Sequence, residues 1–593
     1  MKIYIRHIFY AVIFSFILSS CSYLDLMPDG RYNDENFDDY PKLLRGYVDK
    51  VYNSYLPSTY YSSYYVSLSA LTDDAVYRSE SNSFRKYAVG SANKTGNPFI
   101  PKWEQNYAAI NYLNLFLHEN RGYNTHYLTN PESDLAMRRS LQGDAFGLRA
   151  WMYFDLLRVW GGKGTNGTLL GVPIRLEPTE DIDGLTNRAI KRASFDDCVK
   201  QILADCDSAY KYLHTDNRDY PSDPSQSIMV TGSARYKTLS KVAIDAIRAR
   251  LYLMWASPAY NPDGDMTRYE KAAEYAAKVM KHKLEVESTL AGGFKPLNKF
   301  IWTDCNSQEI IWLSNTIKST DLERAFYPLN FGGTATVVPT QELVDAFPMK
   351  NGYPITDARG GYNKNAPYKD RDPRFYSAIY HHGSRITRST SAEVVYNFDC
   401  AVGGKDAPGG ANTSPTGYYI KKFIYQGWNP YDLNVLTGYH PVFFLRWTQM
   451  CLTFAEAANM TVGPNDEARY GYSAKQAIAW LRSRTTNDGM AGISNDPYLE
   501  ECSGNKDKFD ALVRNEWRIE TCFEGERYYN LRRWGVSITE LNAKLHGVQI
   551  QGTQHDYSPE VETINYPSLW TPIPWTDQER SGIVQNEGWS SWH

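Results

Sequence analysis

A series of segments carries apolar residues at the three- and four-residue spacing that buries one face of a helix. Strand patterns are short and scattered, at residues 309–313, 418–423 and 548–551. We therefore expect a mostly α-helical protein with a few short strands. The predicted helices cover residues 37–56, 103–117, 135–160, 195–213, 239–255, 269–280, 445–459, 474–484, 509–521 and 528–534.

Two of these segments, 239–255 and 269–280, have the features of a tetratricopeptide unit. Small Ala246 and aromatic Trp255 mark the first helix, and Ala272 lies in the second. Repeats of about 34 residues stack as helix pairs and leave a curved face for a partner. Elsewhere the repeat is degenerate. We expect tetratricopeptide-like helix pairs that form a scaffold.

Long insertions interrupt this helical pattern at residues 60–99, 290–346 and 352–439. They are rich in Gly, Asn, Ser, Thr and Tyr, and the whole chain has 46 Tyr beside 23 Phe and 15 Trp. Such segments usually run over the surface, where function concentrates. A carbohydrate presents an apolar C–H face and a ring of hydroxyls, so its site needs flat aromatic rings beside Asp, Asn and Arg. The insertions contain that mixture, although any single tyrosine could instead pack its loop onto the scaffold.

The N-terminus has the pattern of a secretory signal. Lys2 and Arg6 precede an apolar run at residues 8–18, which is shorter than the roughly 20 residues of a transmembrane helix. The run ends in Leu-Ser-Ser-Cys at residues 18–21, which resembles the bacterial lipobox. We expect residues 1–20 to be a signal peptide and Cys21 to carry lipid. The alternative is an ordinary signal with a chance cysteine.

Charge and motif content exclude several other functions. The net charge is −4, with 63 basic and 67 acidic residues, so no basic field attracts nucleic acid. Residues 162–167 match G-x-G-x-x-G, but a predicted helix precedes them where a dinucleotide site needs a strand. We interpret them as a loop that ends that helix. Neither the 8 cysteines nor His381 and His382 have metal-ligand spacing, so we expect no metal site, no cofactor and no disulfide framework.

A hydrolase would need two separated carboxylates with different pKa values. The candidates, Glu516 and Glu520, are i,i+4 neighbours on one predicted helix among several arginines. Nearby arginines lower carboxyl pKa values, which is wrong for an acid catalyst. We interpret the cluster as an ion-pair network that joins helices.

Several segments, in family order from residue 21 to the C-terminus, resemble the SusD/RagB family of surface lipoproteins. The start reads Cys-Ser-Tyr-Leu-Asp, and the region 514–534 resembles the family pattern R-x-ER-x-x-E-x-x-FEG-x-R-x-x-DLRRW. Two departures in that region are Trp517, where the family usually has Arg, and Asn530, where it has an acid. The other matching segments are 148–156 with 160–162 and 171–174, then 246–256, 308–312, 368–375, 455–457, and 572–574 with 585–589.

The resemblance implies a lidlike nutrient-binding protein. Members of the family are lipid-anchored to the outer membrane, face the exterior, and cap a TonB-dependent SusC-like barrel to which they deliver captured oligosaccharide, or in some members peptide. They are not hydrolases. On this basis residues 21–36 form a lipidated tether and residues 37–593 a single SusD-like domain. Its N-terminal part covers about 37–225, and its RagB/SusD part about 300–593.

Binding residues vary with the ligand, so no motif identifies them. In the family the ligand loops fall in insertions like those at 60–99 and 290–335. This position implies the ligand-binding candidates Tyr61, Tyr64, Asp73, Tyr77, Arg78, Phe326, Tyr327 and Asn330. Oligosaccharide capture is the leading hypothesis. A peptide or another nutrient, a surface glycoside hydrolase, and a scaffold without a small ligand are the alternatives.

Overall fold

The computed structural model describes most of the chain. The described residues are 40–58, 64–179, 191–216, 230, 235, 237–288, 307, 309–315, 318–387, 394–410, 413–425, 439–486 and 489–590. Cys21, the tether and Tyr61 lie outside them. The main helices are α2 (Pro41–Lys50), α5 (Ile100–Leu117), α7 (Pro131–Trp160), α8 (Phe195–Tyr212), α9 (Lys241–Ala256), α10 (Thr267–Ser288), α14 (Trp447–Thr461), α15 (Ala474–Arg482), α17 (Lys506–Glu520) and α18 (Glu526–Arg533).

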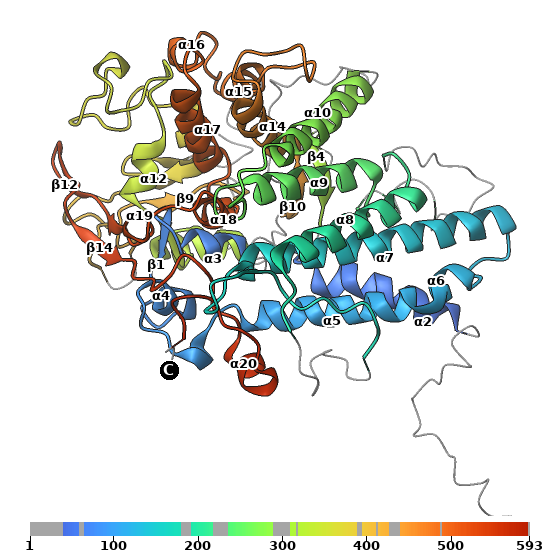
Figure 1. Cartoon of the computed structure of the whole chain (residues 1–593). Coiled ribbons are helices and arrows are strands. Elements are labelled where there is room, and N and C mark those ends of the chain that lie inside the picture. The colour runs from blue at the N-terminus through green and yellow to red at the C-terminus, as the bar shows by residue number, and fades with distance from the viewer. Residues whose placement is uncertain are drawn as a thin grey trace, which may run out of the picture.

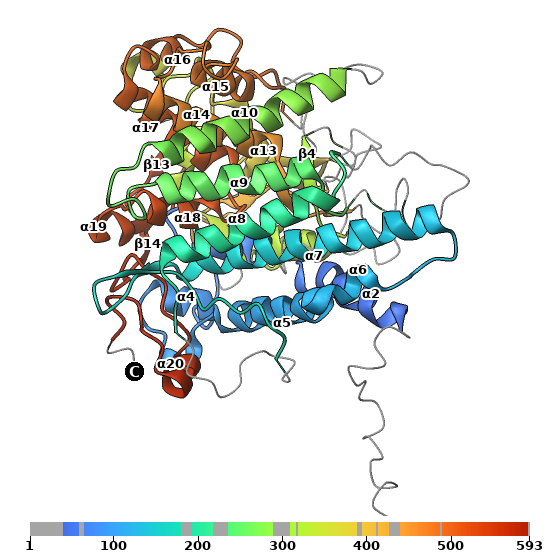
Figure 2. The ribbon, with the colours of Figure 1, turned by 45° about the vertical axis from the view of Figure 1, so that its right-hand side comes forward.

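These helices stack in chain order as successive layers. Helix α5 packs on α7, α7 on α8, α8 on α9, α9 on α10, and α10 on α14. Figures 1 and 2 show this stack from α2 and α5 at one end to α15 and α17 at the other. The predicted fold class, mostly α with paired helices, is confirmed. None of the helices in the described ranges combines the length and the apolar character that crossing a bilayer requires.

Local sequence explains where the stacked helices begin. Helix α7 starts at Pro131, and the Asn130 side chain accepts a hydrogen bond from the Ser133 amide at 2.9 Å. Helix α9 starts after Ser240, whose hydroxyl accepts from the Ala243 amide at 3.2 Å. Such caps satisfy amides that have no partner within the helix.

Close helix packing explains two glycines in α7. A Cβ atom at Gly143 would lie 2.7 Å from the Leu213 side chain, and one at Gly147 would lie 2.7 Å from Leu239. Both distances are shorter than a carbon–carbon contact allows, so these positions let the chain after α8 approach α7 directly.

The insertions contain short elements that helical periodicity did not reveal, because three to six residues are too few to show a period. The first insertion forms α3 (Tyr65–Ser69), β1 (Ala75–Tyr77) and α4 (Ser83–Ala88). The second forms α11 (Asp321–Phe326), η7 (Leu329–Phe331), β5 (Val337–Pro339) and α12 (Gln341–Ala346). Strands β1 and β5 pair antiparallel with Val76 opposite Val338, so the two insertions lie side by side.

The remaining strands also form two-stranded ladders. The three predicted strand regions contain β4 (Ile310–Leu313), β9 (Tyr419–Ile420) and β12 (Gln549–Gln551). Their partners are β10 (Phe443–Arg446), β6 (Ile379–Tyr380) and β13 (Gln554–Asp556). The glycine loop at 162–167 follows the end of α7, as predicted, and connects β2 (Gly162–Lys163) to β3 (Leu169–Leu170).

Short elements complete the described chain. They are the π-helical turn η2 (Val51–Tyr55), η3 (Lys94–Gly96), η4 (His118–Asn120), α6 (Arg121–Asn124), η8 (Ala358–Gly360), α13 (Pro373–Ala378), β7 (Arg385–Thr387), β8 (Val394–Asn397), α16 (Pro497–Cys502), α19 (Ile538–Leu541), β11 (Lys544–His546), β14 (Glu560–Thr563) and α20 (Trp575–Ser581).

Candidate functional site

The ladder of β1 and β5 brings candidate residues of both insertions together. The Arg78 amide donates to the Thr336 carbonyl at 3.0 Å, and Arg78 Nε donates to the Thr334 carbonyl at 2.9 Å. Arg78 is half-buried and Thr334 is exposed. Residues more than 250 positions apart in sequence therefore share one stretch of surface.

Aromatic rings continue this surface toward α3 and α4. The Tyr64 and Phe84 rings meet edge to face with centroids 5.6 Å apart, and Phe84 stacks on Tyr77 at 6.0 Å. Tyr64 and Phe84 are half-buried, whereas Tyr77 is 7% exposed and its hydroxyl shares a hydrogen bond with Ser67 at 2.6 Å. The buried Tyr77 ring therefore packs behind Phe84.

Tyr64 adopts a backbone conformation that large side chains rarely take. It precedes the first residue of α3 with φ of 64°, in the left-handed region. Strained backbone positions persist where the surrounding structure holds them, and they cluster at binding sites. The position holds the Tyr64 ring against Phe84.

Asn330 lies on η7 and is exposed. Its amide Nδ2 donates to the Lys405 carbonyl at 2.6 Å. Gly333 follows, where a Cβ atom would lie 2.1 Å from the Tyr327 carbonyl oxygen, so only glycine fits this turn. We call Tyr64, Arg78, Phe84 and Thr334 the aromatic surface.

The other predicted residues are placed differently. Phe326 is 1% exposed and Tyr327 is 0% exposed, so both rings pack in the core and support η7. Asp73 accepts hydrogen bonds from Arg527 at 2.9 Å and pairs with Arg518 at 3.0 Å. Burial alone would raise the pKa of Asp73, but these two arginines hold it below its ordinary range. Asp73 thus joins the first insertion to α17 and α18.

Phe84 and Thr334 were not among the predicted residues. Phe84 lies in a Ser/Asn-rich stretch of the first insertion, so its aromatic character was a usable signal. Thr334 has no such signal, because its place beside Arg78 depends on the pairing of β1 with β5.

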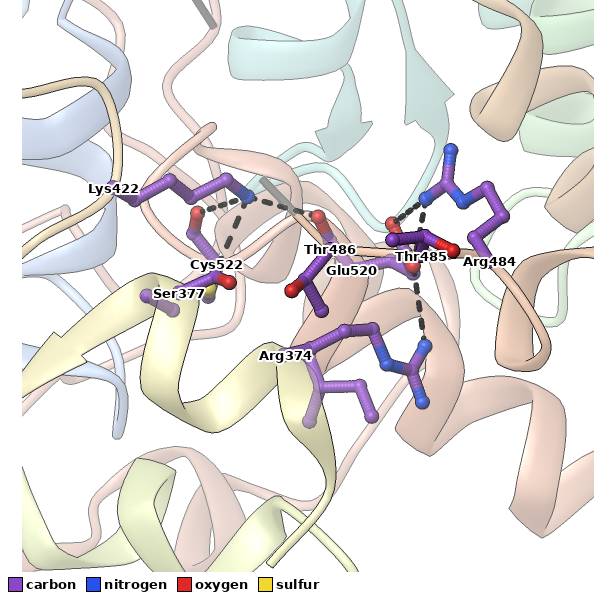
Figure 3. A pocket seen from close by; sticks show the side chains of 10 residues that line it. Arg374, Ser377, Lys422, Arg484, Thr485, Thr486, Glu520 and Cys522 are labelled. Carbon is purple, nitrogen blue, oxygen red and sulfur yellow. Dashed lines mark hydrogen bonds and ion pairs between the residues drawn. The ribbon is translucent and has the colours of Figure 1, made fainter. Parts of the chain in front are cut away.

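A small cavity lies over the cluster of arginines and glutamates (Figure 3). Its volume is about 70 Å³, and Arg374, Lys422, Arg484 and Glu520 contribute to its wall. Arg484 Nη2 donates to Glu520 Oε2 at 2.7 Å, and Arg374 Nη1 donates to Glu520 Oε1 at 3.1 Å. Lys422 Nζ donates to the Cys522 carbonyl at 3.0 Å. Each of these four charged side chains thus has a hydrogen-bond partner within the protein.

The electrostatics of this cluster do not suit acid–base catalysis. Burial alone would raise the pKa of Glu520, but Arg484, Arg374 and Arg446 hold it below its ordinary range. Glu516 is fully buried and accepts from Arg482 at 2.5 Å and Arg374 at 2.7 Å. The carboxylate of Glu520, held ionised in this way, cannot serve as a general acid. The interpretation of this cluster as an ion-pair network that joins helices is confirmed.

Comparisons with known proteins agree with this architecture. Residues 301–589 match the family model described as SusD family, and residues 22–244 match the model described as starch-binding associating with outer membrane. Among curated proteins, none matches the sequence significantly.

Solved structures with the same fold cover nearly the whole chain. A SusD-like protein from Bacteroides fragilis NCTC 9343 is 24% identical with a TM-score of 0.70, covering 94% of this chain and 98% of its own. A SusD-like carbohydrate binding protein from the same organism is 19% identical with a TM-score of 0.65, covering 92% and 99%. Surface glycan-binding protein A from Bacteroides fluxus is 16% identical with a TM-score of 0.56, covering 94% and 100%.

Proposed function

The chain belongs to the SusD family, and on that premise we propose that it is a non-enzymatic binding protein that captures oligosaccharide at the cell surface. Two of its structural relatives are described as carbohydrate- or glycan-binding proteins. The observation that carries the proposal is the aromatic surface.

This surface has the chemistry that an oligosaccharide requires. The half-buried rings of Tyr64 and Phe84 present flat apolar faces for the C–H face of a sugar. The Arg78 side chain donates to the Thr334 carbonyl, and Asn330 is exposed four residues before Thr334, so polar side chains lie on the two insertions that meet here. Small-ligand sites typically combine an apolar face with a small number of well-placed polar groups. Tyr61, three residues before Tyr64 in the chain, is proposed as a further contact.

We also propose that the protein is attached to the outer membrane by lipid on Cys21 and faces the exterior. From there it would deliver its ligand to a SusC-like TonB-dependent barrel. Two or more acyl chains anchor a protein stably, whereas a single chain does not. This role follows from the family resemblance and from the lipobox at residues 18–21.

A calorimetric screen of residues 22–593 against plant, host and microbial oligosaccharides tests the proposed function. We expect saturable binding of at least one glycan with no product formed. Binding of peptides alone, with no response to any glycan, would contradict oligosaccharide capture. It would not contradict delivery of a captured ligand to a SusC-like barrel.

Glycoside hydrolysis is the alternative that the arginine–glutamate network argues against. Prolonged incubation with the same glycans should release no new reducing ends. Sustained turnover that is lost in both Glu516→Gln and Glu520→Gln, with folding intact, would overturn the non-enzymatic assignment.

A further inference from the structure

Arg85 contacts the backbone of the aromatic surface without being one of its residues. It follows Phe84 on α4, and its side chain is 14% exposed. Its Nη1 atom donates to the Tyr77 carbonyl at 3.1 Å and to the Arg78 carbonyl at 2.9 Å. Arg78 is also the residue whose Nε donates to the Thr334 carbonyl. One guanidinium group thus holds the end of β1 from which Arg78 reaches the second insertion.

Glu562 fixes Arg85 from the C-terminal part of the chain. Arg85 Nε donates to Glu562 Oε2 at 2.6 Å, although the two residues are 477 positions apart. Glu562 lies on β14 opposite Leu545 of β11, and its side chain is 2% exposed. Glu80 is a weaker partner of Arg85, because its carboxylate is 3.8 Å away and 88% exposed. The β11–β14 ladder therefore sets the orientation of the planar Arg85 guanidinium.

Helix α4 is itself fixed at both ends. At its start the Asn82 side chain accepts a hydrogen bond from the Phe84 amide at 2.9 Å. At its end the Ala88 carbonyl accepts from the Asn565 amide at 2.8 Å, just beyond β14. Arg85 lies between these two bonds, so its side chain connects a fixed helix to the end of β1.

The start of β1 is held by different contacts. The Asp74 carbonyl accepts from the Thr340 amide at 3.1 Å, and the Asp74 carboxylate accepts from Arg518 Nε at 2.7 Å. These bonds tie the start of β1 to the residue before α12 and to α17. Loss of the Arg85 contacts should therefore loosen the end of β1 and leave its start in place.

We propose that Arg85 and Glu562 are positioning residues for ligand binding, which act through Arg78 and Phe84 without contacting the ligand. The inference rests on the proposed function, because Arg78 and Phe84 belong to the aromatic surface. Binding residues must be held within about 0.5 Å of their productive positions, and hydrogen bonds from supporting residues provide this precision. Arg85 bonds to the carbonyl of Arg78 and adjoins Phe84 in the chain, so it supports both. Affinity should depend on the bonds to the two carbonyls more than on the charge of the pair.

Two variants separate these bonds from the charge. Arg85→Lys keeps the positive charge opposite Glu562, but it has one donor nitrogen where arginine has separate Nε and Nη1 atoms. We expect it to weaken binding of the screened oligosaccharide about tenfold in calorimetry. Glu562→Gln removes the negative charge and keeps an acceptor for Arg85 Nε. It should weaken binding less than Arg85→Lys, although its free energy of unfolding should fall more, because the Arg85 charge loses its compensation.

Glu342→Gln is the matched control. Glu342 lies on α12, accepts from the His546 amide at 3.0 Å and pairs with His546 Nδ1 at 2.6 Å. It therefore also joins an insertion to the β11–β14 ladder, but through β11. Its affinity should stay within about twofold of the wild type. Hydrogen exchange of the amides at residues 79–82 should become faster in Arg85→Lys and stay unchanged in Glu342→Gln.

The outcomes distinguish this inference from the proposed function. A folded Arg85→Lys variant with wild-type affinity would overturn the positioning role and leave oligosaccharide capture standing. Affinities that fall in the same order as the free energies of unfolding across the three variants would show a structural role only, and would also overturn it. Arg85→Gln provides a second variant should Arg85→Lys fail to fold, with the same expected loss. Absence of any glycan binding by the wild type would overturn both proposals.

Discussion

The carboxylate of Glu456 accepts two parallel hydrogen bonds from the guanidinium of Arg533, at 2.5 and 2.6 Å. The indole N–H groups of Trp517 and Trp534 donate to the same carboxylate, each at 2.9 Å. Glu456 lies on α14, so this single side chain joins α14 to α17 and α18. The family usually has arginine at position 517. Trp517 donates a hydrogen bond to Glu456 without adding a charge.

Replacing Glu456 by Gln should destabilise the protein severely. The pair is almost fully buried, with side-chain exposures of 4% and 6%, and removing one partner leaves the Arg533 charge uncompensated. Losses from breaking such pairs are roughly 3–5 kcal/mol. Denaturant-induced unfolding measures the change. Glu500→Gln is the control, because Glu500 is 64% exposed and its pair with Lys475 should contribute little. Equal unfolding curves for both variants would contradict this prediction.

Acid should destabilise the protein through its buried glutamates. Burial alone would raise the pKa values of Glu309, Glu456 and Glu520, but neighbouring arginines hold all three below the ordinary range. In acid the unfolded chain therefore binds more protons than the folded chain. The stability that these groups contribute is present above the unfolded pKa of about 4.3 and is lost as pH falls through the lower folded pKa.

This acid dependence can be measured as the free energy of unfolding between pH 6 and pH 3, by denaturant titration. Glu520→Gln should be less stable than the wild type at pH 6 and should lose less stability on acidification, because it lacks one of these carboxyls. If the free energy of unfolding of the two proteins falls by the same amount between pH 6 and pH 3, Glu520 does not contribute to the acid sensitivity and the prediction is wrong.

Removing the half-buried Tyr64 ring of the aromatic surface should weaken oligosaccharide binding. Tyr64→Ala takes away one wall of the surface, and we expect affinity to fall about tenfold, which corresponds to about 1.4 kcal/mol. Arg78→Ala should act in the same direction. Calorimetry with the screened glycan tests both. Tyr353→Ala is the control, because Tyr353 lies in a different insertion, at residues 352–439. Its ring centroid is 5.5 Å from that of Tyr498. An equal loss in that control would argue against a local site.

Cys21→Ala should release the protein from the membrane. The lipid attached to Cys21 is the proposed anchor, so its loss should move the protein from the membrane fraction to the soluble fraction. Cell fractionation with immunodetection follows the change, and metabolic labelling with palmitate should mark the wild type alone. A variant that remains membrane-bound and labelled would place the anchor elsewhere.

Local periodicity was sufficient to predict the helical scaffold. Segments such as α7, α9 and α14 are long enough to show helical spacing, and caps such as Ser240 lie beside them in sequence. The charged pattern around Glu516 and Glu520 also predicted an ion-pair network, because its members recur at helical spacing among arginines. These properties depend on neighbours within one or two turns, which a sequence displays directly.

The candidate site depends on contacts between distant residues, which periodicity does not contain. Arg78 meets Thr334 because β1 pairs with β5, and strands of three residues carry no signal that names a partner. The burial of Phe326 and Tyr327 could not be predicted from the sequence either, because an aromatic residue in an insertion can face the core or the solvent. Tertiary packing alone therefore decided which of the candidate residues share one stretch of surface.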